Sequence, residues 1–449
     1  MGRRARRQGA LVTILCALVT LFPRAGAARL QWLGRISDAE NEAIRYSATT
    51  PSDAIARLQQ DIDAGTTRLQ FDTSHGYLNS VLRALRISPA SQSLVFSRTS
   101  FQRDLISPER PRALYFNHDV YVGWVQDAPV LEIASVDPRI GAIFYTLDQA
   151  RSAHPVFRRE VARCLSCHDS PAVTGGVPGL IMKSVYPDES GQPIVAAGTF
   201  LTTDRSPLPE RWGGWYVTGT HGSQRHMGNM TVGAAAERPL PDLSPGANVT
   251  DLRTRFDTRR YATAHSDLVA LMILEHQTAV QNLITRAGYR TRMALAFDEI
   301  RRATLGRPDG DSSEDTRRVV ESVAEPLVHA MLFVGEAPLS ERVAGTSAFA
   351  DQFNAQGPRT TGGRSLFELD LQRRLFRHRC SYMIYSASFD GLPSAVRQQV
   401  YRRLWDVLGG ADSGSTFAHL APAERATIRT ILLETKPDFA AWIRARASP

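Results

Sequence analysis

Residues 164–168 read Cys-Leu-Ser-Cys-His, a spacing in which two thiols and an imidazole can hold one cofactor. In a C-x-x-C-H pattern both thiols form thioether bonds with the vinyl groups of a haem, and the histidine takes one axial position on the iron. Two intervening residues keep Cys164 and Cys167 on one side of a helical turn. The sequence therefore predicts one covalently attached haem c, held by Cys164 and Cys167, with His168 as an iron ligand.

This short segment resembles the haem site of c-type cytochromes. Two further segments, 211–229 and the run Cys380-Ser-Tyr-Met-Ile-Tyr-Ser, are similar to a group of long, exported, uncharacterised bacterial proteins that contain a cytochrome c domain and one haem. That wider similarity covers most of residues 40–440 and implies no particular activity. The chain has a single C-x-x-C-H, which departs from the two-centre arrangement of di-haem peroxidases.

Two other chemistries use cysteines at this spacing. A thioredoxin-like pair needs a preceding βαβ pattern, which is missing, and is not followed directly by histidine. A zinc site needs more Cys or His nearby, and Asp169 and Cys380 do not complete such a set. Cys380 has no cysteine left to pair with after processing, so we expect a buried thiol and no disulfide.

The second axial position on the iron decides between electron transfer and chemistry on a bound ligand. A thioether or a second imidazole closes this position, whereas an empty or water-filled position admits peroxide, oxygen or other small ligands. Met227 is the first candidate because it follows His168 by 59 residues, broadly as the distal methionine does in small cytochromes c. A methionine is also a common core filler. The alternative ligands are His226, His221 and Met230.

The haem propionates need donors, and the planar guanidinium of arginine suits carboxylates. The candidates by proximity in the sequence are Arg163, Arg211 and Arg225. An aromatic run nearby is either an apolar wall against the porphyrin or an ordinary strand with a bulge. This run consists of Trp212, Trp215 and Tyr216.

The first 27 residues have the pattern of a secretory signal peptide. Four arginines precede an apolar core from Ala10 to Phe22, and Ala25-Gly26-Ala27 gives an A-x-A cleavage site. The apolar core is too short to anchor the chain, and the general secretory route is favoured over the twin-arginine route. Covalent haem is attached beyond the cytoplasmic membrane, so a periplasmic or secreted location agrees with the motif.

The net charge of +8 falls to +3 once the five arginines of the leader are removed. No cluster of positive charge indicates a nucleic-acid partner. Lysine occurs only at positions 183 and 436, so the lysine-ringed docking face of many small cytochromes c is not expected. No later apolar stretch is long enough to span a membrane.

The residue patterns predict an α+β fold. Residues 30–90 have the helical period, and short β-rich runs between 94 and 146 predict a small antiparallel sheet. Phe157, Val161, Cys164 and Leu165 share one helical face, which places the haem cysteines at the end of a helix. From residue 254 onward, helical patterns dominate.

These patterns divide the chain after the signal peptide into four parts. We expect an α+β N-terminal domain (28–150), a haem-binding segment (151–232), a linker rich in proline (233–253) and a helical C-terminal domain (254–449).

The expected function is that of an exported mono-haem c-type cytochrome that transfers electrons to or from a partner protein. One alternative is a haem enzyme, such as a peroxidase or small-molecule oxidase, because several hundred further residues can build a substrate pocket. The other is a haem-based sensor or binding module, although no output domain is visible.

Overall fold

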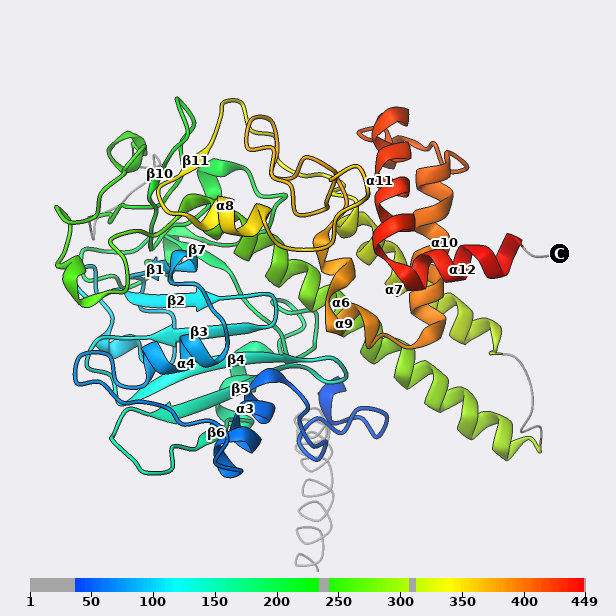
Figure 1. Ribbon diagram of the computed structural model, residues 1–449, viewed down its shortest axis with the longest axis horizontal. Coiled ribbons are helices and arrows are strands. Elements are labelled where there is room, and N and C mark those ends of the chain that lie inside the picture. Colours follow the sequence, from blue (N-terminus) through cyan, green and yellow to red (C-terminus); the bar gives the residue numbers. More distant parts are fainter. Residues whose placement is uncertain (1–36, 234–241, 307–311, 448–449) are drawn as a thin grey trace, which may run out of the picture.

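The computed structural model describes residues 37–233, 242–306 and 312–447. The predicted signal peptide therefore lies outside the described residues. The fold is mixed α+β, as predicted, with a seven-stranded antiparallel sheet in the N-terminal half and a helical C-terminal region (Figure 1).

The sheet has the strand order β6-β5-β4-β3-β2-β1-β9, and each neighbouring pair is antiparallel. Strands β1 to β5 confirm the meander predicted for residues 94–146. The strands are β1 (Ser93–Val95), β2 (Arg112–Phe116), β3 (Val120–Trp124), β4 (Val130–Asp137), β5 (Gly141–Asp148), β6 (Phe157–Arg159) and β9 (Trp215–Tyr216).

One local prediction is wrong. Phe157 does not belong to the helix that carries Cys164, Cys167 and His168 but starts the edge strand β6, where it pairs with Leu147. The helix begins only at Ala162. A buried aromatic side chain is compatible with a helix or with a strand. The backbone pairing of this segment with β5 makes it a strand.

Both faces of the sheet are covered, because side chains alternate between the faces of a strand. On one face, Ile133 and its neighbours pack against α3 (Ala54–Asp63) and α4 (Leu78–Ala84). On the other, Ala134 and Phe144 belong to the same core as the first turns of α6 (Leu268–Thr304). This second core continues into the C-terminal helices. The segment that carries the C-x-x-C-H motif therefore packs against residues from both halves of the chain.

Helix α6 is the central element of the C-terminal region and has 37 residues. The Asp267 carboxylate caps it by accepting from the backbone N–H groups of Val269 (2.8 Å) and Ala270 (3.2 Å). The helical patterns predicted after residue 254 correspond to helices of the structure. Besides α6, these are α7 (Glu314–Met331), α8 (Phe349–Asn354), α9 (Ala387–Asp390), α10 (Ser394–Gly409), α11 (Pro422–Thr435) and α12 (Pro437–Ala447).

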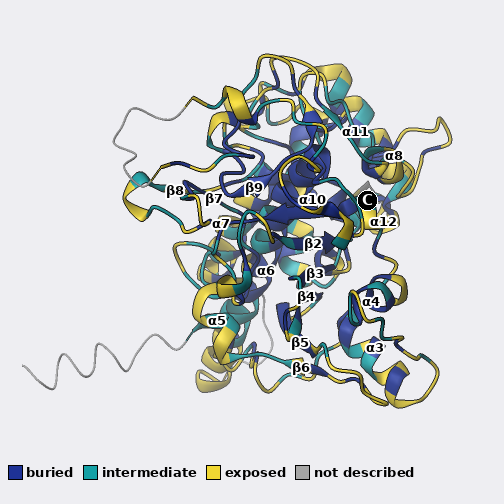
Figure 2. Cartoon of the chain, turned by 90° about the vertical axis from the view of Figure 1, so that its left-hand side faces the viewer, coloured by how far each residue is buried: buried dark blue, intermediate teal, exposed yellow. Residues whose placement is uncertain are grey.

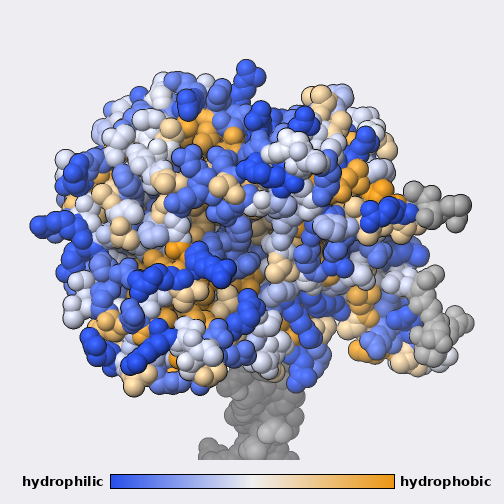
Figure 3. Space-filling view, viewed as in Figure 1, coloured by the Kyte–Doolittle hydropathy of each residue, from blue (hydrophilic) through white to orange (hydrophobic). Residues whose placement is uncertain are grey.

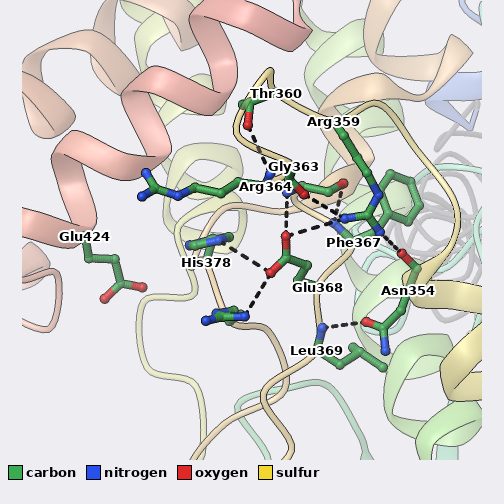
Figure 4. Close-up of polar contacts among 12 residues, drawn as sticks. Asn354, Arg359, Thr360, Gly363, Arg364, Phe367, Glu368, Leu369, His378 and Glu424 are labelled. Atoms are coloured by element: carbon green, nitrogen blue, oxygen red, sulfur yellow. Dashed lines mark hydrogen bonds and ion pairs between the residues drawn. The ribbon is translucent and has the colours of Figure 1, made fainter.

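A long irregular segment between α8 and α9 is fixed by the Glu368 carboxylate (Figure 4). One carboxylate oxygen accepts from the Ser365 backbone N–H at 2.8 Å and lies 3.6 Å from Arg359 Nη1. The other lies 3.2 Å from Arg377 Nη1 and 4.0 Å from His378 Nε2. These contacts replace the ladder hydrogen bonds that a loop of this length lacks.

Buried residues fill the space between the sheet and the helices (Figure 2). The face seen in Figure 3 is mainly hydrophilic, with separate apolar patches between charged side chains. Within the described ranges, no helix combines the length and the apolar composition that crossing a bilayer requires.

Candidate haem site

Helix α5 (Ala162–His168) carries all three residues of the C-x-x-C-H motif. Leu165 attaches this short helix to the protein, because it packs against the cores on both faces of the sheet. Cys164 is half-buried and Cys167 is exposed. The Cys167 side chain therefore lies at the surface, whereas Cys164 packs partly against the core.

The imidazole of His168 is held in one tautomer. Its Nδ1 lies 2.8 Å from the carbonyl oxygen of Gly179, which can only accept, so Nδ1 carries the proton. The lone pair of Nε2 is then available, and no hydrogen bond from the described residues reaches this atom. The ring packs against Phe144 at a centroid distance of 4.5 Å. A hydrogen bond like that from His168 Nδ1 to Gly179 orients metal-ligating histidines in general.

Burial lowers the pKa of His168 below its ordinary value. The hydrogen bond to Gly179 and the charge of Glu132 act in the opposite direction, and the charges of Arg112 and Lys183 lower the pKa further. The imidazole is therefore neutral at pH 7, which is the form that binds a metal.

The Gly179 carbonyl is positioned by a helix more than 100 residues away in sequence. The Asn282 side chain of α6 accepts from Leu180 N–H at 2.8 Å and donates to Leu180 C=O at 2.7 Å. We call this pair of hydrogen bonds from Asn282 to Leu180 the Asn282 clamp. A Cβ atom on Gly179 would lie 2.6 Å from Asn282 Oδ1, so only glycine fits next to it.

Cys164 lacks the environment of a reactive thiol. Burial raises the pKa of Cys164 to about 11, and Glu160 and Glu132 add to this effect. The thiol is therefore protonated at pH 7, unlike the attacking cysteine of thioredoxin-like proteins. No three His, Cys, Asp or Glu side chains in the described part of the chain are grouped as metal ligands, so the zinc interpretation gains no support.

Cys380 is fully buried, as predicted. Burial raises the pKa of its thiol to about 12. This thiol is a small core side chain rather than a reactive group.

The two histidines proposed as second axial ligands have nitrogen lone pairs that are already used. His226 Nδ1 accepts from the backbone N–H of Gly228 at 3.0 Å, so its Nε2 carries the proton. His221 Nε2 accepts from the backbone N–H of Asn248 at 3.0 Å. The two rings contact each other at a centroid distance of 4.7 Å. His168 alone among these three histidines presents a free Nε2 lone pair.

The two candidate methionines lie in a separate small cluster. Met227 packs with Tyr186 and Val232, and its Sδ accepts from Ser184 Oγ at 3.5 Å. Met230 is half-buried beside the same cluster. This cluster is distinct from the core that contains Phe144, the ring against His168.

The three candidate arginines occupy different places. Arg211 is buried, where its Nη1 lies 3.1 Å from Glu275 Oε2. Arg225 donates to the Ser223 and Gln224 carbonyl oxygens of its own loop. Arg163 is exposed on α5.

Arg163 has two neighbours at the surface. Its guanidinium lies over the Phe101 ring at 4.9 Å, and Nη1 is 3.8 Å from Glu160. Arg163 is thus the only one of the three arginines that lies on α5 with the motif residues.

The aromatic run forms a strand. Trp215 and Tyr216 make up β9, which pairs with β1, and the Trp215 Nε1 donates to the Lys183 carbonyl at 2.8 Å. Trp212 is fully buried and has a left-handed backbone conformation with φ 65°. The strand interpretation, with an irregular residue before it, matches the structure.

A second group of polar side chains has the composition of a hydrolytic triad. His276 Nε2 lies 2.8 Å from Ser381 Oγ, and His276 Nδ1 lies 3.6 Å from Asp204 Oδ1. His276 and Ser381 are fully buried, and Ser381 Oγ also accepts from the Met383 backbone N–H. A substrate carbonyl has no route to this serine, so the group joins α6 to the loop before α9.

Comparison with known proteins gives no relative: no family model, curated protein or solved structure matches this chain. The site therefore depends on its own geometry. The sequence alone does not single out Phe144, Gly179 and Asn282, the residues that contact His168 or position its partner. Pro178-Gly179 belongs to a stretch of turn-forming residues after the motif, which was the local sign of an irregular backbone there.

Proposed function

We propose that this chain is an exported mono-haem c-type cytochrome that transfers electrons. Cys164 and Cys167 would hold the haem through thioether bonds, and His168 would bind the iron through Nε2. The observation that carries this proposal is the Nδ1 hydrogen bond from His168 to Gly179, which leaves Nε2 free on the same short helix that carries the two thiols. The leader and the single motif agree with a periplasmic or secreted protein that works with a partner.

When bound, the haem supplies a one-electron couple between ferric and ferrous iron. The chain supplies the binding and orientation. The two thiols fix the porphyrin edge, and the Gly179 carbonyl fixes the imidazole. Phe144 packs against the ring of His168. A ligand held in one orientation limits reorganisation when the charge of the centre changes.

One observation favours a second function, the binding of a small molecule on the iron. His221, His226 and Met227 already donate or accept within the protein, and none of these contacts involves His168 or Phe144. If none of them moves, the second axial position is open. A centre of that kind binds gases or peroxide and belongs to a haem enzyme or sensor.

The experiment is to produce the full chain in a bacterium that has cytochrome c maturation machinery, and to measure intact mass and absorption spectra. The matched controls are the double variant Cys164→Ser/Cys167→Ser and the single variant Cys380→Ser. The wild type and Cys380→Ser are expected to carry the mass of one haem, and the double variant none. The same mass shows whether residues 1–27 have been removed.

Spectra of the oxidised and reduced protein, with and without carbon monoxide, separate the two functions. A low-spin spectrum that the gas does not change supports electron transfer. A high-spin spectrum that shifts with the gas contradicts electron transfer as the function and supports the binding of a small molecule on the iron. A wild-type protein without added mass contradicts both.

A further inference from the structure

Phe101 is an exposed aromatic residue that lies against the helix of the C-x-x-C-H motif. The centre of its ring is 4.9 Å from the guanidinium carbon of Arg163 on α5. Phe101 is nevertheless 53% exposed. Among the phenylalanines of residues 37–233, 242–306 and 312–447, only Phe101 and Phe297 are exposed. Phe101 is thus an aromatic ring next to α5 with about half of its residue surface uncovered.

Helix geometry places the Phe101 ring on the side of α5 that carries Cys167. Residues four apart in a helix lie one above the other on the same face, so Arg163 and Cys167 are neighbours. Both are exposed, whereas Leu165 lies on the other side of the helix, in contact with the two cores. The ring that contacts Arg163 therefore lies on the side where a group bound to Cys167 is attached.

The next residue, Gln102, fixes the backbone at Phe101. Gln102 is buried, and its Nε2 donates to Glu132 Oε1 at 2.9 Å. The backbone N–H of Gln102 donates to the same oxygen at 3.3 Å. Glu132 lies on β4, and the neighbouring strand β5 carries Phe144, the ring that packs against His168. Phe101 and the contact partner of His168 are therefore held by adjacent strands of one sheet.

We propose that the Phe101 ring packs against the porphyrin of the haem, an inference that rests on the proposed function. A porphyrin is a large, flat and mainly apolar surface, and aromatic side chains stack on such surfaces. A phenyl ring has no lone pair for the iron, so Phe101 supplies contact area and not a ligand. The aromatic run that the sequence suggested for this role is buried at β9 and before it, and consists of Trp212, Trp215 and Tyr216.

The experiment places one labelled methyl group at position 101. Phe101→Met is produced with ¹³C-methyl methionine in the haem-bearing protein, and NMR spectra are recorded in the reduced state under carbon monoxide, where low-spin ferrous iron is diamagnetic. The new signal is assigned because the wild-type spectrum lacks it. The matched control is Phe297→Met, because Phe297 is the other exposed phenylalanine and is 67% exposed on α6.

The ring current of a porphyrin shifts the signal of a methyl group that lies against its face upfield. We therefore expect the methyl signal of position 101 to lie upfield of the signal of position 297. In the haem-free background Cys164→Ser/Cys167→Ser, the signal of position 101 should lose this shift. A haem-bearing protein in which the signals of positions 101 and 297 coincide overturns this inference alone. A wild-type protein without haem mass overturns the proposed function and this inference together.

A second measurement does not need the label. Water stabilises the more positive ferric state, so the loss of a side chain that covers the haem should lower the reduction potential. Phe101→Ala should therefore have a lower potential than the wild type, and Phe101→Leu, which keeps most of the apolar area, a potential between the two. The control Phe297→Ala should keep the wild-type value. Equal potentials in Phe101→Ala and Phe297→Ala contradict the proposal.

Discussion

Asn282 binds both backbone polar groups of Leu180, with its Oδ1 2.8 Å from the N–H nitrogen and its Nδ2 2.7 Å from the carbonyl oxygen. Leu180 directly follows Gly179, the residue whose carbonyl orients His168. A side chain of the central helix therefore holds the residue next to the carbonyl group that orients His168 on α5.

The first prediction concerns this clamp. Asn282→Ala leaves two buried backbone groups without partners, so the free energy of unfolding should fall by about 1–3 kcal/mol. Because the Gly179 carbonyl is then less well fixed, the reduction potential of the haem-bearing protein should change as well. Denaturant unfolding and a redox titration measure the two effects.

The control for this clamp is Asn354→Ala. Asn354 Oδ1 accepts from the Leu369 backbone N–H at 2.8 Å in the C-terminal region. This variant should lose stability without a change in potential. If both variants change the potential equally, or neither does, the positioning role of Asn282 is wrong.

The second prediction concerns the other axial position. Met227→Leu and His226→Gln should leave the absorption spectrum of the haem unchanged, because Ser184 already donates to the sulfur and Gly228 donates to the imidazole. Met227→Leu conserves volume and should cost less than about 1.5 kcal/mol. If the absorption band that indicates a sixth ligand is lost in one of the variants, the substituted residue is an iron ligand and the prediction is wrong.

The third prediction concerns the buried ion pair of Arg211 with Glu275, at 3.1 Å. Arg211→Met leaves the carboxylate uncompensated in the core, so the free energy of unfolding should fall by about 3–5 kcal/mol. The double variant Arg211→Met/Glu275→Leu should lose less than the sum of the two single variants. It should not recover fully, because Arg211 also donates to the carbonyl oxygens of Ser206 and Asp204.

The exposed pair of Arg317 with Glu314 serves as the control for that cycle. Its removal should cost no more than about 1 kcal/mol. Strict additivity of the two single variants at positions 211 and 275 would show that the buried pair does not act as a unit.

The fourth prediction concerns pH. Burial lowers the pKa of His226 to about 3, and the charges of His221 and Arg225 add to this. In the unfolded chain His226 has the ordinary pKa of about 6.5, so below that pH the unfolded chain binds a proton at His226 and the folded chain does not. The free energy of unfolding is therefore unaffected by His226 above that pH and decreases as the pH falls below it. The slope is about 1.4 kcal/mol per pH unit for one proton.

Between pH 4 and 6, we therefore expect the slope of the free energy of unfolding against pH to be smaller in His226→Gln than in the wild type, by the amount that corresponds to about one bound proton. His154→Gln is the matched control, since that side chain is 57% exposed. Parallel pH curves for wild type and His226→Gln would show that His226 does not titrate abnormally.

The sequence alone determined the α+β class and most of the elements. Helical and strand periodicities are local properties, so they identified α6, α7, α10 and the meander from β1 to β5. The pairing of β9 with β1 was not predictable in this way, because those strands are separated by more than 100 residues. The edge strand at Phe157 was mistaken for helix for the same reason: only its partner β5 distinguishes the two.

The motif at 164–168 is equally local, and it alone led to the proposed haem and to its first iron ligand. The tertiary structure decided which nitrogen of His168 is free, which lone pairs of His221 and His226 are used, and where Arg211 is buried. Hydrogen bonds and charges between residues far apart in the chain leave no periodic trace in the sequence, so only the folded arrangement specifies them.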